Sequence, residues 1–110
     1  MTFDELRIAN KERCEKSFHG HIDDWNSLEW AGAMAGEAGE ACNECKKLRR
    51  GEPIDAATIA FEVADTVIYA DLLCQRLGIR LEDAVATKFN LTSDKYGSAI
   101  KLPAPAGGAK

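Results

Sequence analysis

The chain has 110 residues, 45% of them hydrophobic and 29% charged, which suits one globular domain with one modest core. Its formal net charge of −4 argues against a nucleic-acid partner, and it holds no apolar run of the roughly 20 residues that a membrane-spanning helix needs. The charged N-terminal stretch has no apolar signal core, so we expect a cytoplasmic protein that binds neither nucleic acid nor membrane.

Capping signals predict where the first two helices begin. Thr2, with a glutamate three residues later, has the spacing of a capping box and opens a helix over residues 3–18. A polar loop, 19–25, follows. Asn26 repeats the capping box and opens a long helix that ends just before Gly51.

Proline and glycine mark the third and fourth helices. A proline and then Asp55 open the third, which ends at Gly78, and the fourth covers residues 81–93. We therefore predict an all-α fold, a helical bundle around an antiparallel helix pair that a short turn joins. One domain is expected over 1–101, with a flexible C-terminal tail over 102–110.

The third helix carries more apolar surface than one small partner helix covers. Its apolar residues spread widely around the helix, which predicts a bundle completed by oligomerisation into a homodimer or homotetramer. These residues are Ile59, Val63, Val67, Ile68 and Leu72.

Four carboxylates stand out in the second and third helices. Glu37 and Glu40 are three residues apart in the second helix, so they lie on one face of it. Glu62 and Asp65 have the same spacing in the third. Glu40 and Asp65 each lie about 18 Å along their helices from the turn, so the two pairs are expected to meet.

Four facing carboxylates repel one another and lose water, and a divalent cation offsets that cost. Mg²⁺ takes oxygen ligands and bridges to phosphates, so we predict that the four acids hold Mg²⁺, with Mn²⁺ as the alternative ion. Gly36 and Gly39 flank the glutamates and cost about 1 kcal/mol each in a helix, which indicates a close backbone approach. Glu44 is seven residues after Glu37 and lies on the same face of the helix, so it is expected to be a fifth ligand or a residue that supports the ligands. Asp71 lies on the opposite face of the third helix and is expected to be a surface or interface charge.

The order and spacing of these acids resemble those of the MazG-like all-α nucleotide pyrophosphohydrolases. That family has E-x-x-E, a gap and then E-x-x-D. Here Glu37-Ala-Gly-Glu40 is followed, after 21 residues, by Glu62-Val-Ala-Asp65. The surrounding GEAGEACNECKKLRRGE and EVADTVIYADLLCQRLGI also match the family's style, and the resemblance spans roughly residues 25–97.

The resemblance implies a Mg²⁺-dependent cut between the α- and β-phosphates of a nucleoside triphosphate, in nucleotide-pool cleaning by a dimer or tetramer. Either Glu37 or Glu40 would take the proton of the attacking water, and the sequence leaves this choice open. Lys88 would neutralise charge on the pyrophosphate leaving group. Asn90 and Lys95 are carried over from the family as further substrate-binding residues.

Aromatic residues at helical spacing are candidates for stacking on the base. Trp30 lies seven residues before Glu37, about 10 Å along the axis, and Tyr69 lies seven after Glu62. Trp25 lies in the loop before the second helix. Aromatic faces stack on bases with about 1–3 kcal/mol each. For Trp30 and Tyr69, packing in the core is the somewhat favoured alternative, and for Trp25 packing and base stacking are equally good interpretations.

Two other interpretations of the acids are open. A di-iron bundle needs Glu-x-x-His motifs on two helices, whereas His19 and His21 lie outside both acidic motifs. A non-enzymatic helical interaction module would carry the acids as a solvated face, and it would bind neither Mg²⁺ nor a nucleotide.

Overall fold

The computed structural model describes residues 1–18 and 20–105, and every regular element in these residues is helical. The predicted all-α class is therefore confirmed. No helix in the described part of the chain is both long and apolar enough to cross a membrane. The elements in chain order are α1 (Phe3–Arg13), η1 (Cys14–Phe18), η2 (Ile22–Asp24), α2 (Ser27–Arg49), α3 (Ala56–Arg76) and α4 (Leu81–Lys95).

Side chains fix where the long helices begin. The Thr2 hydroxyl accepts the Glu5 N–H at 3.1 Å, and Asn26 Oδ1 accepts the Glu29 N–H at 2.8 Å. Both predicted capping boxes are present, and each satisfies N–H groups that a helix start leaves without partners. Asp55 caps α3 in the same way, by accepting an N–H of its first turn at 2.9 Å.

The first predicted helix changes its winding before it ends. Residues Cys14–Phe18 continue α1 as a π-helical turn, and Gly20 then donates its N–H to the Cys14 carbonyl at 3.1 Å. Gly20 has a φ of +81°, which favours glycine. A single π-helical turn does not change the apolar pattern of an α-helix enough to be recognised, so the sequence predicted an ordinary helix up to residue 18. His19 lies outside the described residues.

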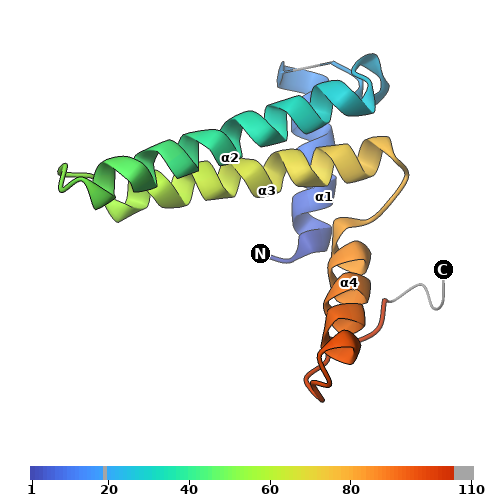
Figure 1. Cartoon of the computed structure of the whole chain (residues 1–110). Coiled ribbons are helices and arrows are strands. Elements are labelled where there is room, and N and C mark those ends of the chain that lie inside the picture. Colours follow the sequence, from blue (N-terminus) through green and yellow to red (C-terminus); the bar gives the residue numbers. More distant parts are fainter. Residues whose placement is uncertain (19, 106–110) are drawn as a thin grey trace.

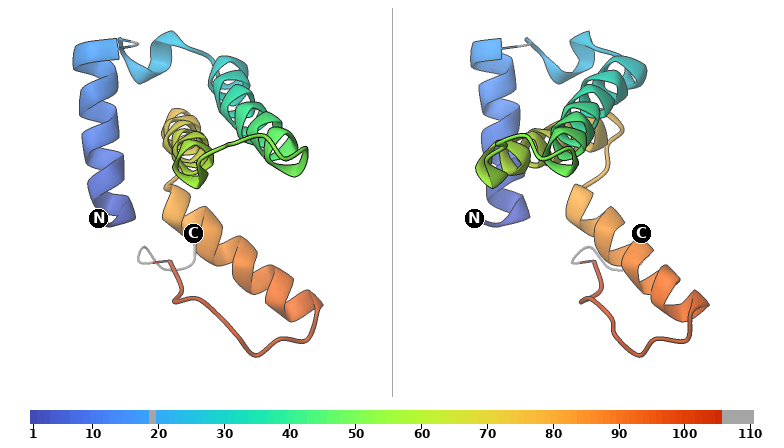
Figure 2. Two further views of the ribbon diagram at one scale, coloured as in Figure 1. Left: turned by 90° about the vertical axis from the view of Figure 1, so that its left-hand side faces the viewer. Right: turned by 60° about the vertical axis from the view of Figure 1, so that its left-hand side comes forward.

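Helix α3 is the centre of the arrangement. Figure 1 shows α2 and α3 side by side along their length, joined by the turn at residues 50–55, with α1 crossing α3. In the left view of Figure 2, α3 lies between α1 and α2. Helix α4 follows the turn at Gly78 and points away from the α2–α3 pair.

The core is small and lies where η1, η2, α2 and α3 meet. Trp30 is its largest member, with 0% of its surface exposed, and its Nε1 donates to the Ile22 carbonyl at 3.0 Å. Cys14, Ile22 and Leu72 are buried around it. The core therefore joins the start of α2 to the second half of α3, and it leaves the far end of the helix pair with little buried apolar surface.

Asp71 was expected to be a surface or interface charge, and its burial shows that the surface position is wrong. Only 2% of the residue is exposed, because α1 packs across this face of α3. Its Oδ2 accepts hydrogen bonds from Asn10 Nδ2 and Gln75 Nε2, both at 2.8 Å. These donors replace water around the carboxylate and make its burial tolerable.

The segment after α4 turns back along it. The Asn90 side chain donates to the Leu102 carbonyl at 3.0 Å and accepts the Leu102 N–H at 2.8 Å. Leu102, the first residue of the predicted tail, is thus tied to α4. Residues 106–110 lie outside the described part of the chain, so the predicted flexibility there stays a prediction.

Candidate metal centre and adjoining pocket

Three of the four predicted ligands lie together. Oxygen atoms of Glu37 and Glu40 on α2 and of Glu62 on α3 all lie within 4.8 Å of one another. The i, i+3 spacing puts the two α2 glutamates on the face toward α3, and the pairing of the helices brings Glu62 opposite them. Asp65 follows one turn later on α3. It does not belong to this group of three, and it lines the pocket next to it.

Crowding of like charges changes the acidity of the cluster. Hydrogen bonding with Glu40 and then Glu37 raises the pKa of Glu62 to about 7, and loss of water and the two negative charges add to the rise. A proton held between carboxylates relieves their repulsion at low pH. At higher pH, where this proton is lost, a bound divalent cation would relieve the same repulsion.

The donor set fits Mg²⁺ or Mn²⁺. It consists only of carboxylate oxygens, the ligand type that hard divalent cations prefer, and it is partly open to solvent, so water can complete the coordination shell. No histidine or cysteine belongs to the group of three, which disfavours zinc. Glu44 is outside this group and forms an ion pair with Lys47 at 3.2 Å.

The close backbone approach predicted at Gly36 and Gly39 does not occur within the chain. A Cβ atom added at either position would meet no described atom within 4 Å. Both glycines are exposed, and the space beside their Cα atoms is open among the described residues.

A pocket of about 370 Å³ adjoins the acids, between α1 and α3. Asp65 and Tyr69 line it from α3, one turn apart on the same face. Asn10, Arg13 and Cys14 with Phe18, Ile68 and Leu72 complete the lining. The residues from α1 and η1 were not predicted as site residues, because their spacing does not show which helix this segment packs against.

The pocket also carries its own charge pattern. The Arg13 guanidinium lies over the Phe18 ring, 5.2 Å from its centroid. Burial raises the pKa of Tyr69, and the negative charges of Glu37 and Asp65 raise it further. Tyr69 is therefore a neutral phenol near neutral pH, at the border between the acid cluster and the pocket.

The predicted base-stacking aromatics separate into two groups. Tyr69 lines the pocket. Trp30 is in the core, with its N–H bonded to a carbonyl, so its ring has no exposed face for a base. Trp25 is half-buried, with its ring centroid 4.5 Å from that of Trp30, and it does not line the pocket. For Trp30 the structure favours packing over substrate binding.

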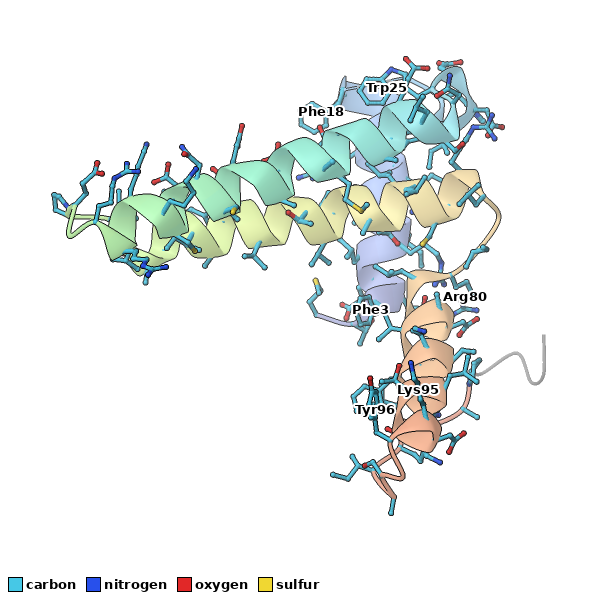
Figure 3. All side chains as sticks on the ribbon, viewed as in Figure 1. Phe3, Phe18, Trp25, Arg80, Lys95 and Tyr96 are labelled. Carbon is cyan, nitrogen blue, oxygen red and sulfur yellow. The ribbon has the colours of Figure 1, made fainter. Side chains whose placement is uncertain are left out.

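The predicted residues of α4 do not join the acids within this chain. Lys95 lies far down α4 in Figure 3, with its ammonium 5.5 Å from the centroid of the Tyr96 ring. The Asn90 amide is engaged with the backbone of Leu102, and Lys88 is exposed. The physical reason is the direction of α4, which leaves α3 at the end opposite the α2–α3 turn.

Comparisons of the chain with protein-family models, with curated proteins and with solved structures found no match.

Proposed function

We propose that this protein is a Mg²⁺-dependent nucleoside triphosphate pyrophosphohydrolase, which converts an NTP or dNTP to the monophosphate and pyrophosphate. The observation that carries the proposal is the convergence of Glu37, Glu40 and Glu62 from two helices, within 4.8 Å. The choice of reaction comes from the E-x-x-E and E-x-x-D motifs, whose order and spacing resemble those of the MazG-like enzymes.

Each acid has a role in this proposal. Glu37, Glu40, Glu62 and Asp65 would hold the ion, which supplies charge neutralisation on the phosphates and acidifies a bound water. Glu37 or Glu40 would accept the proton of the attacking water as general base. Both carboxylates lie on the face of α2 toward α3, so either one could act as the general base while the other remains a metal ligand.

Assembly belongs to the same proposal. The bundle around the antiparallel α2–α3 pair would be completed by a second copy or a pair of dimers. Lys88 would then neutralise the pyrophosphate leaving group from the α4 of another copy. A soluble, cytoplasmic enzyme of nucleotide-pool cleaning is the setting that we infer from the resemblance.

Pyrophosphate release from a panel of NTPs and dNTPs tests the proposal. We expect turnover of at least one substrate with Mg²⁺ or Mn²⁺ and none with EDTA. Glu40→Gln, Glu62→Gln and Asp65→Asn should each abolish most activity while the protein stays folded. Glu12→Gln, which changes an exposed acid of α1, should keep native rates.

Two results would overturn the proposal. Absence of turnover across the whole panel at high enzyme concentration would remove the activity, and release of orthophosphate would show that another bond is cut. Titration calorimetry distinguishes the non-enzymatic alternative, because an interaction module with a solvated acidic face should bind neither Mg²⁺ nor a nucleotide.

A further inference from the structure

Asn10 has an amide whose orientation is determined by its neighbours. Its Nδ2 donates to the Ile68 carbonyl at 2.9 Å and to Asp71 Oδ2 at 2.8 Å. A carbonyl and a carboxylate only accept, so the group that faces them has to be the NH₂ and not the oxygen. Both hydrogens of the amide are then used.

Asp71 is itself held in place. Gln75 Nε2 donates to the same Oδ2 at 2.8 Å and to the Arg7 carbonyl at 3.0 Å. The Gln75 amide is therefore fixed by the same logic, since both of its partners are acceptors. A buried acceptor with two fixed donors leaves Asn10 no alternative orientation.

The amide oxygen of Asn10 is the group that remains. It has no hydrogen-bond partner among the described residues, although only 4% of Asn10 is exposed. Asn10 Oδ1 is also open to solvent. Among the described residues, the only fully buried side-chain nitrogen or oxygen atom without a hydrogen bond is Glu15 Oε2. Asn10 lines the pocket between α1 and α3, where a ligand can supply the missing donor.

The same pocket offers features that suit a nucleobase. Phe18 and Tyr69 provide aromatic rings, and the Arg13 guanidinium has no carboxylate partner among the residues that the structure describes. Arg13 therefore has N–H donors left for a ring nitrogen or carbonyl of a base. Asp65 lines the pocket beside the acid cluster, so a base here would have its phosphates toward the acids.

We propose that Asn10 Oδ1, oriented by Asp71, accepts a hydrogen bond from the exocyclic amino group of a nucleobase, so that the pocket prefers cytosine or adenine nucleotides over their keto counterparts. This inference rests on the proposed function and names its substrate class. A keto oxygen at the same position would displace water from Oδ1 and face it with no hydrogen between them, so the acceptor would be left unsatisfied in the complex.

Matched substrate pairs test the preference. CTP and UTP, and likewise ATP and ITP, share sugar and phosphates and exchange an amino for a keto group. We expect kcat/KM for pyrophosphate release to favour the amino member by about tenfold to a hundredfold in at least one pair. In the favoured pair, the analogue with hydrogen in place of the amino group should lose about as much. A ratio below about threefold in both pairs, or a keto preference, overturns the inference.

Variants assign the preference to Asn10. Asn10→Leu should reduce the amino-to-keto ratio to about one, mainly by lowering kcat/KM for the amino member, whereas a general structural lesion would lower both members alike. Lys11→Ala, an exposed neighbour on α1, should leave the ratio unchanged. A folded Asn10→Leu protein with the native ratio would show that Asn10 does not read the base. If this variant does not fold, the analogue without the amino group decides.

The test also separates this inference from the proposed function. Pyrophosphate release with equal rates within each pair would overturn the base preference alone. If no triphosphate is cleaved, calorimetric titration with CMP against UMP, and AMP against IMP, still measures the pocket. Selective binding of CMP or AMP would then support the proposed base preference although the proposed activity is rejected. Absence of selective binding would overturn the base preference as well.

Discussion

Glu62 is the residue whose chemistry the structure changes most. Its pKa lies at about 7 instead of 4.5, because it shares hydrogen bonds with Glu40 and Glu37. Between these two pH values the folded protein binds a proton that the unfolded chain releases. In the metal-free protein, the contribution of Glu62 to the free energy of unfolding should therefore be fully present below pH 4.5 and be lost as the pH rises to about 7.

Glu62→Gln should flatten this pH dependence, because glutamine does not titrate and carries no charge toward its neighbours. Urea denaturation in EDTA, at pH 4.5 and above pH 7, measures the difference. Glu12→Gln serves as the control and should keep the native dependence. An unchanged pH dependence in Glu62→Gln would mean that the titration of another group sets the acid stability.

At the scale of elements, a polar contact docks α1 on α3. Asp71→Leu would leave the donors of Asn10 and Gln75 without their acceptor, which should lower the free energy of unfolding by about 2–4 kcal/mol. Gln75→Leu removes one donor of two and should cost about 1 kcal/mol. Urea denaturation at neutral pH provides both values.

A double substitution checks that the contact, and not the bulk of leucine, is responsible. Asn10→Leu combined with Asp71→Leu replaces donor and acceptor together, so its cost should be smaller than the sum of the two single costs. Additive costs would show that the two side chains act independently and that α1 is docked by its other contacts.

At the scale of the whole molecule, the chain is more extended than its length requires. Its radius of gyration is 16.3 Å, whereas a compact chain of this length has about 13 Å. Large apolar residues of α3 and α4 stay exposed, among them Phe61 at 71% and Phe89 at 42%. A second copy is the partner that we propose for this surface, in line with the oligomer that the apolar pattern of the third helix predicts.

Light scattering at micromolar concentration should therefore give a dimer or a tetramer. Phe89→Glu, which puts a charge on the exposed apolar face of α4, should shift the mass toward the monomer. Leu28→Glu changes a more exposed leucine at the start of α2, at 78% against 42% for Phe89, and should leave the mass unchanged. A monomeric native protein would refute the assembly and, with it, the route by which Lys88 reaches the phosphates.

The sequence predicted the local features because their causes are local. Capping by Thr2 and Asn26 depends on residues three positions away, and the turn at Gly78 depends on one backbone conformation. The meeting of Glu37 and Glu62 was also predictable, since a hairpin of known helix rise fixes which residues face each other across it.

Contacts between helices distant in the sequence were decided by the tertiary structure alone. The helical pattern does not reveal that α1 crosses α3, so Asp71 was expected at the surface or at an interface, and Asn10 was not singled out. Trp30 had two interpretations until the crossing of four elements enclosed its ring. Periodicity identifies which face of a helix is apolar, whereas burial depends on what packs against that face, and only the folded chain determines it.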